Sequence, residues 1–399
     1  MKKDIYSFWN QKIINEQVLY EISFSIFLFA SILQYSTFMS FFSHNLFHYF
    51  MYIGLGILYF KIFFIDKPSA KEFFLKVAVL GLLVLIWRKS SDFTLFTMGT
   101  YILGAKYVDF RRIIKLYFVL GTTILIFVMI SSLTGLIKNL VYYRDVSGTI
   151  RQSFGIIYPT DFAAHVLYLV LAYSYLRFSK LNFVDYIAYV IIASLLIIYC
   201  DARLSALTII LAIPILWIGQ QASRGNDFNR KVAYFYWWVP VFGAYATLCS
   251  YFFYNPHNTL FLKLNAALSG RLAIGSTAIN KYGFTWFGTH IVEHGWGGEK
   301  GYAMSHNNPM NYFYVDSSFL RIGIMYGVVA LIAILVIMSI ISWRSIQDHT
   351  YALASILVLV TVSAIVEQRL IDLSFDPFLI AILANVKKNK FNNLMEERS

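Results

Sequence analysis

The sequence predicts an all-α polytopic membrane protein with about twelve transmembrane helices. Only 14% of the 399 residues are charged and 58% are hydrophobic, whereas a soluble domain is usually about 25% charged and roughly half apolar. The hydrophobic residues also fall into runs of about membrane-crossing length, roughly 17–25 residues each. These observations exclude a soluble globular enzyme, a disordered chain and a disulfide scaffold.

The candidate spans are the apolar runs, taken here in chain order. They cover about 19–42, 46–65, 73–88, 93–109, 113–137, 160–178, 183–200, 203–219, 232–253, 317–341, 350–366 and 373–386. Pro159, with Thr160 and Asp161, is an ordinary start for the sixth. The runs at 73–88 and 373–386 are short, so either is a candidate re-entrant segment.

The positive charge predicts which side each loop occupies. Lys and Arg number 33 against 21 Asp and Glu, a net charge of +12, and cytoplasmic loops collect Lys and Arg. More than half of these cations lie on the two tails and the even-numbered connections. We therefore interpret the charge as topology rather than nucleic-acid binding, with both termini cytoplasmic.

Two segments are expected outside, on a single domain over residues 1–399. One is the loop 138–159, and the other is the large loop 254–316, which we expect to cap an active site. A loop of that length is usually functional.

Several arginines fall on the outer side despite the positive-inside tendency: Arg88, Arg144, Arg151, Arg203, Arg271, Arg321 and Arg369. Ionisable groups at a membrane edge are costly and usually face a cavity or a partner. Arginine presents a planar fork that grips phosphate with two parallel hydrogen bonds, so such a cluster suits a lipid diphosphate. The alternative is that each arginine pairs with a nearby carboxylate, as in Arg144–Asp145, Arg203–Asp201 and Arg369–Asp372.

Two residues near the end of the large loop are candidates for a general base, His306 and Asp316. A base must reach the acceptor hydroxyl and have a workable pKa. The plainer interpretation makes Asp316 a helix N-cap and His306 a loop histidine. His165, inside the sixth run, is either a helix–helix hydrogen-bonding residue or a site residue.

Residues His290 to His294 match the inverted zinc-peptidase pattern H-x-x-E-H. That pattern needs a helix, so that both histidines share a face. Glycines at 295, 297 and 298 follow immediately, which favours a loop. A membrane metalloenzyme built on Glu293 is therefore kept only as an alternative.

These pieces together resemble the bacterial polysaccharide repeat-unit polymerases of the Wzy type and their relatives, the O-antigen ligases. The resemblance covers about 140–340 and rests on the stretches 151–161, 201–206, 269–272 with 286–288, and 316–320 followed by Gly323 and Gly327. The sequence departs from the family's commoner residues at Thr160, Ala202 and Ser317.

The resemblance implies a membrane glycosyltransferase of GT-C-like architecture in the bacterial cytoplasmic membrane. Such an enzyme moves a growing glycan from undecaprenyl diphosphate onto another lipid-linked repeat unit at the outer face, and the polymer becomes a capsule, an exopolysaccharide or an O-antigen. The resemblance implies no cofactor and no metal. Donor and acceptor are both undecaprenyl-diphosphate-linked oligosaccharides in membrane lipid, with a chain-length regulator as a candidate partner.

The expected roles follow from combining the resemblance with the residues above. They are diphosphate binding by Arg151, Arg271 and Arg203, general base catalysis by Asp316 or His306, and substrate lining by Tyr158, His165 and Arg321. Two rivals stay open. One is a ligase that passes finished glycan to another acceptor, and the other is a flippase or transporter of lipid-linked glycan.

Overall fold

The computed structural model describes residues 15–144, 148–307 and 312–386, and it is mostly helical, with 74% helix. The amino-terminal half contributes α2 (Glu16–Gln34), η1 (Thr37–Ser40), α3 (His44–Phe60), η2 (Lys61–Ile65), α4 (Ala70–Ser90), α5 (Thr94–Gly104), α6 (Phe110–Leu133), β1 (Val141–Arg144), β2 (Thr149–Gln152), α7 (Pro159–Arg177), η3 (Phe178–Lys180) and α8 (Phe183–Cys200). The rest contributes α9 (Arg203–Ser223), α10 (Asp227–Tyr234), η4 (Phe235–Trp238), α11 (Val239–Phe252), α12 (Thr259–Ala267), α13 (Arg271–Tyr282), α14 (Gly298–Asn307), α15 (Ser318–Arg321), η6 (Ile322–Tyr326), α16 (Val328–Gln347), α17 (Ala352–Val366) and η7 (Phe378–Ile382).

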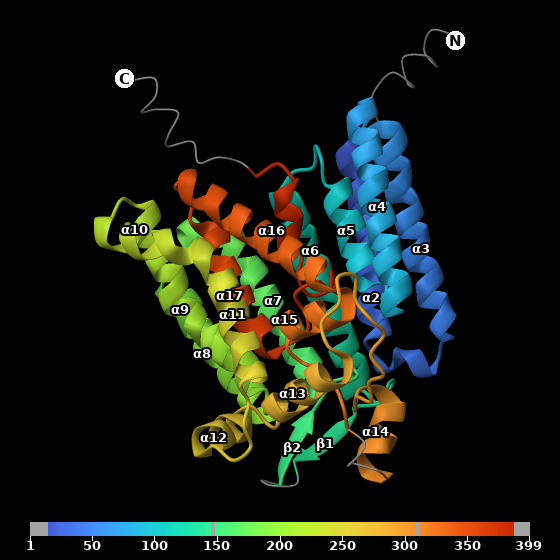
Figure 1. The fold of residues 1–399 in the computed structure, drawn as a ribbon, viewed down its shortest axis with the longest axis vertical. Coiled ribbons are helices and arrows are strands. Elements are labelled where there is room, and N and C mark those ends of the chain that lie inside the picture. The colour runs from blue at the N-terminus through green and yellow to red at the C-terminus, as the bar shows by residue number, and fades with distance from the viewer. Residues whose placement is uncertain (1–14, 145–147, 308–311, 387–399) are drawn as a thin grey trace.

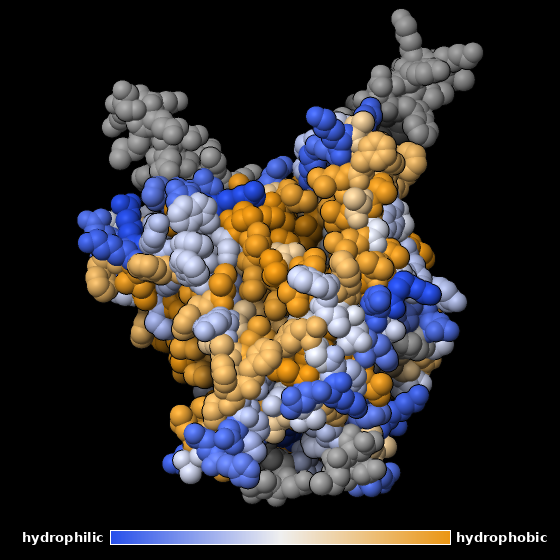
Figure 2. All heavy atoms as spheres, viewed as in Figure 1, coloured by the Kyte–Doolittle hydropathy of each residue, from blue (hydrophilic) through white to orange (hydrophobic). Residues whose placement is uncertain are grey.

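Six helices are long and apolar enough to cross a membrane. They are α2, α3 continued through η2, α6, α8, α9 and α16, and α17 is a shorter apolar helix. Their outward faces carry large apolar side chains such as Phe64, Leu133 and Ile198, each more than three-fifths exposed. Figure 2 shows this hydrophobic surface between two more hydrophilic ends. The chain is therefore an all-α membrane protein with several crossings.

The bundle has two distinct ends. At one end, Gln17 Oε1 accepts a hydrogen bond from Asp109 N (2.6 Å), and Phe110 N donates to Asn385 O (3.1 Å). The described chain therefore starts and finishes at the same end, which we call the tail end (Figure 1). The opposite end, the cap end, carries the β1–β2 hairpin and helices α12, α13 and α14 (Figure 1).

Helices occupy every predicted run except the last, and the prediction of a transmembrane helix at 373–386 is wrong. Between Glu367 and Val386 the structure has turns, irregular backbone and the short η7. Asp372 Oδ1 accepts from Ser374 N (3.1 Å) and Asp376 Oδ1 accepts from Phe378 N (2.8 Å). Such local side-chain bonds compete with a helix, and Pro377 removes a further donor.

This irregular segment nevertheless runs the length of the bundle. Glu367 O accepts from Ser318 N at the cap end (3.2 Å), whereas Asn385 N donates to Val108 O at the tail end (2.7 Å). Residues 369–381 between them are buried. Non-helical backbone at membrane depth is tolerated where protein surrounds it, and the helices provide that surrounding here.

The loop 283–297 is fastened to η6 by a close backbone approach. Thr289 N donates to Met325 O (3.2 Å) and Val328 N donates to Thr285 O (2.9 Å). Gly288 has a φ of +83°, and a Cβ added there would lie 2.1 Å from Met325 O. Only glycine meets both conditions, since the left-handed region and the close contact both exclude a side chain.

We expect Gly288→Ala to destabilise the protein by at least about 1–3 kcal/mol, the usual cost of a strained backbone conformation. Denaturant unfolding of the purified protein in detergent measures this. Gly56→Ala is the matched control, because Gly56 lies within α3 and has no atom within 4 Å of an added Cβ. Equal stabilities of the two variants would contradict the close approach.

Candidate functional site

The cap end gathers the predicted arginines, and most of them are ion-paired there. Arg271, the first residue of α13, lies 2.9 Å from Asp316 (Nε to Oδ2), and both side chains are about one-fifth exposed. Gly270 precedes it in the left-handed region, with a φ of +84°. Burial raises the pKa of Asp316 above its usual range, and the neighbouring Arg271 opposes that rise.

A second pair joins the large loop to α15. Arg321 donates from Nη1 to Glu293 Oε1 (2.8 Å) and lies 2.7 Å from Oε2 through Nη2. Its guanidinium also lies 5.1 Å from the centre of the Tyr314 ring. This two-point contact is the geometry in which arginine binds carboxylates most strongly.

A third cluster joins α7 to the irregular carboxyl-terminal segment. Arg369 pairs with Asp161, and its Nη1 lies 3.7 Å from Asp372 Oδ2. Asp372 also accepts a hydrogen bond from Tyr35 (2.8 Å). Arg321 and Arg369 line a small polar cavity of about 110 Å³, together with Tyr35, Asp92, Tyr314 and Gln368.

Arg151 differs from these arginines. Its side chain is buried, with the residue only 8% exposed, yet it forms no ion pair with any carboxylate in the described parts of the chain. Instead Nε donates to Cys200 O (3.1 Å) and Nη1 donates to Tyr158 Oη (3.3 Å). A buried charge is expensive unless it is paired, so the environment of Arg151 differs from that of the ion-paired arginines.

Arg203 lies at the rim beside Arg151. It opens α9 and pairs with Asp201 (2.8 Å), while its side chain is 62% exposed. Asp201 directly follows Cys200, whose carbonyl oxygen holds Arg151. The structure thus brings Arg151 into contact with Tyr158 and with the Cys200 carbonyl, three residues before Arg203.

A row of aromatic rings connects this place with the Arg271–Asp316 pair. Tyr142 packs on Tyr158 (4.7 Å between ring centres) and donates to Trp296 O (2.7 Å). Trp296 in turn packs on Tyr312 (4.6 Å). Burial raises the pKa of Tyr312, Asp316 adds to that rise and Arg271 opposes it. These contacts link Tyr158, the partner of Arg151, to Tyr312, which lies four residues before Asp316.

His306 and His165 lie apart from this group. His306 is exposed near the end of α14, with Nδ1 2.9 Å from Tyr302 O. Within the described residues no contact joins His306 to Asp316. His165 is buried within α7 and stacks on Phe375 (3.9 Å between ring centres).

The structure bears on two alternatives for the charged residues, namely local ion pairing of the arginines and a zinc site at 290–294. Arg203 pairs with Asp201 and Arg369 contacts Asp372, as the pairing interpretation expects. The pair Arg144–Asp145 falls on Asp145, outside the described residues. The stretch 290–294 is not helical, and both Glu293 oxygens are engaged by Arg321, so this stretch lacks the geometry of the zinc pattern.

One carboxylate was missed in the sequence. Glu367 follows α17, is partly exposed, and accepts a hydrogen bond from Ser205 Oγ at Oε1 (2.7 Å). Burial raises its pKa to about 7, against the opposing effects of Ser205, Arg271 and Arg369. The sequence does contain a signal for this site, because the charged residues Glu367, Arg369 and Asp372 follow directly after an apolar run.

Comparison of the chain with protein-family models, with curated proteins and with solved structures finds no match.

We expect Glu293→Gln to destabilise the protein by about 3–5 kcal/mol, because it leaves the buried Arg321 without its carboxylate. Unfolding in detergent measures the change. Glu299→Gln is the control, since Glu299 pairs with Lys138 at a site where both side chains are more than two-fifths exposed, and such pairs contribute about 1 kcal/mol or less. A loss of bound zinc without a loss of stability would instead favour the metalloenzyme.

Proposed function

We propose that this protein polymerises undecaprenyl-diphosphate-linked oligosaccharide repeat units at the outer face of the bacterial cytoplasmic membrane. In this proposal the cap end faces outward and both tails lie in the cytoplasm. The irregular segment 367–386 then supplies the twelfth crossing in a GT-C-like arrangement. The tail end carries many cations, including Lys61, Lys106 and Arg112, which agrees with the positive-inside tendency.

The observation that carries the proposal is the buried Arg151. A guanidinium held by one carbonyl and one hydroxyl keeps donors free for a phosphate. The rim position of Arg203 adds a second cation within the same group. Fixed donors aimed at a developing negative charge stabilise the departing diphosphate without a metal.

The acceptor side of the reaction needs a base. The bond between the donor sugar and its diphosphate breaks, the bond between that sugar and the acceptor hydroxyl forms, and the hydroxyl proton must leave. Asp316 is one candidate, but Arg271 holds its carboxylate. Glu367 has one oxygen beyond the Ser205 hydrogen bond and a pKa near 7, which suits proton transfer at neutral pH.

The first experiment removes the protein and weighs the lipid-linked glycans by mass spectrometry. Carriers bearing a single repeat unit outside the membrane, with longer chains lost, are the expected result. Accumulated long lipid-linked chains would indicate a ligase, and single units trapped on the inner face would indicate a flippase. An unchanged glycan profile would overturn the proposal.

We expect Arg151→Gln to slow polymer formation by about 100-fold, the usual effect of removing one such donor. Arg151→Lys keeps the charge but loses the fork, so it recovers only part of the rate. Polymer length on gels, normalised to the amount of protein, measures both. Arg112→Gln is the control, because Arg112 pairs with Glu21 on the exposed tail end. Normal polymer in cells carrying Arg151→Gln would contradict a role of Arg151 in diphosphate binding.

The pH dependence tests Glu367 as the base. With a pKa near 7, its ionised and proton-accepting fraction rises between about pH 6 and 8, so turnover of lipid-linked repeat units by purified protein rises over that interval. We expect Glu367→Gln to lower the rate and to abolish its rise with pH. A Glu367→Asp variant keeps a titrating carboxylate and therefore keeps the rise. An unchanged step in Glu367→Gln would return the role to Asp316.

A further inference from the structure

A second cavity lies at the tail end, away from the site above. It measures about 470 Å³ and lies between α10, η4 and the turn that joins α16 to α17. The contacts of α9 place it at this end. Gln220, near the end of α9, donates to Phe178 O and Leu181 O (2.6 and 3.1 Å), and Arg111 donates to the neighbouring Leu176 O.

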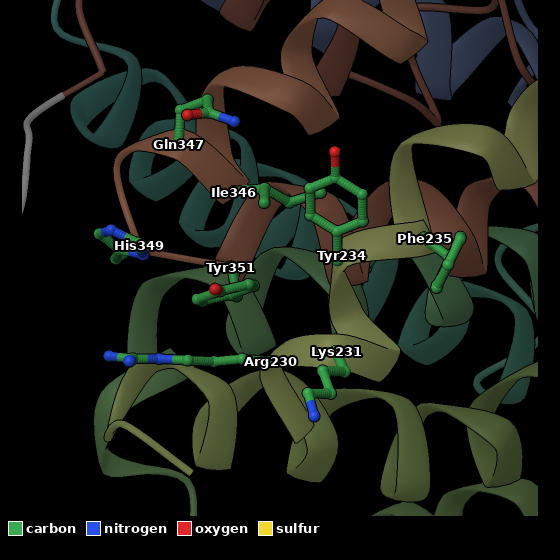
Figure 3. A pocket seen from close by; sticks show the side chains of 8 residues that line it. All are labelled: Arg230, Lys231, Tyr234, Phe235, Ile346, Gln347, His349 and Tyr351. Carbon is green, nitrogen blue, oxygen red and sulfur yellow. The ribbon is translucent and has the colours of Figure 1, made fainter. Parts of the chain in front are cut away.

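The cavity is lined by cations. Arg230 and Lys231 give it two fixed positive charges, His349 adds an imidazole ring, and among the described residues no carboxylate lines it. Figure 3 shows the Arg230 guanidinium and the His349 ring extending toward the same side, with the Tyr351 ring set between them. Asp227 and Asp348 belong to the same segments but are absent from the lining.

These cations are weakly committed within the protein. Arg230 donates from Nε to Ala222 O (3.2 Å) and lies 4.0 Å from Asp227 Oδ1, on a carboxylate whose side chain is 90% exposed. Such an exposed pair contributes little. Lys231 forms no ion pair or hydrogen bond with any residue that the structure describes.

The turn above the cavity is held in a strained shape. His349 and Tyr351 both lie in the left-handed region, with φ values of 52° and 54°. Backbone bonds from Thr350 N and Tyr351 N to Ser345 O (3.0 and 3.1 Å) keep them there. Strain of this kind persists only where surrounding structure imposes it, and it concentrates at binding sites.

The surface next to the cavity is apolar and aromatic. Phe235, Trp238 and Phe242 follow one another along η4 and α11 and are 62%, 50% and 68% exposed. Trp237, Trp238 and Trp343 pack together beside them. Aromatic side chains of this kind mark the headgroup level of a bilayer, and Figure 2 shows hydrophilic residues over α10 bordering the hydrophobic face.

We propose that this cavity binds the phosphate headgroup of an anionic phospholipid of the inner leaflet, with the acyl chains lying along Phe235, Trp238 and Phe242. A basic pocket between helices on the cytoplasmic side is suited to an anionic lipid headgroup. The volume lies within the range of small-molecule sites, about 300–1,000 Å³. The adjoining apolar surface favours a lipid over free phosphate. This site is independent of glycan polymerisation.

The test titrates purified full-length protein in detergent with phosphatidylglycerol and with phosphatidylcholine of the same chain length, counting bound lipids by native mass spectrometry. We expect phosphatidylglycerol to bind preferentially. The double variant Arg230→Gln/Lys231→Gln weakens that binding by about tenfold or more, since each cation near the membrane surface contributes about 1 kcal/mol. Lys231→Gln alone weakens it less and serves if the double variant fails to fold.

Lys67→Gln/Lys71→Gln is the matched control. It removes the same charge at the tail end from two exposed lysines that do not line the cavity, and we expect phosphatidylglycerol binding to be unchanged. An equal loss in both double variants would overturn the proposal in favour of general surface charge. Equal binding of phosphatidylcholine, or full displacement of the lipid by millimolar inorganic phosphate, would overturn it as well.

Discussion

A guanidinium taken out of water must be met by an opposite charge, and this requirement organises the cap end of the bundle. Arg321 holds the large loop through Glu293, Arg369 holds the irregular segment against α7 through Asp161, and Arg271 holds α13 to the segment just before α15 through Asp316. Each pair joins elements that are distant in the chain. Arg151 differs, because its partners in the described residues are a carbonyl and a hydroxyl, and the proposed diphosphate role rests on that difference.

The two ends of the molecule treat charge in opposite ways. At the cap end Arg271, Arg321 and Arg369 are largely shielded from solvent and paired, so their interactions resist screening by salt. At the tail end the cations of α10 are partly or fully exposed and weakly paired. They lie next to the packed rings of Trp237 and Trp343. The paired arginines of the cap end therefore hold fixed positions, whereas the cations of α10 stay available for charged groups outside the protein. Lys61 is an exception, since it is buried and pairs with Asp66 (2.8 Å).

The helices could be predicted from the sequence because apolar run length depends on membrane thickness alone. The prediction of a helix in the last run is wrong because Asp372 and Asp376 form local side-chain hydrogen bonds that favour turns. Apolar composition alone does not reveal these bonds. Ion pairs between residues two or three positions apart, such as Asp201 with Arg203, could be predicted from their spacing in the sequence. The pair of Asp161 with Arg369 could not, since 208 residues separate them. Glu367 was likewise hidden, because its partner Ser205 lies on another helix.

The irregular final segment has a consequence for biosynthesis. A helix can leave the insertion machinery for lipid on its own, because its backbone groups bond to one another, but residues 367–386 leave many backbone groups dependent on other parts of the protein. Tyr117 supplies one such partner by donating to Phe375 O (2.6 Å), and Arg344 supplies another to Ile382 O (2.8 Å). The segment therefore reaches its final conformation only when the helices that supply these partners are packed around it.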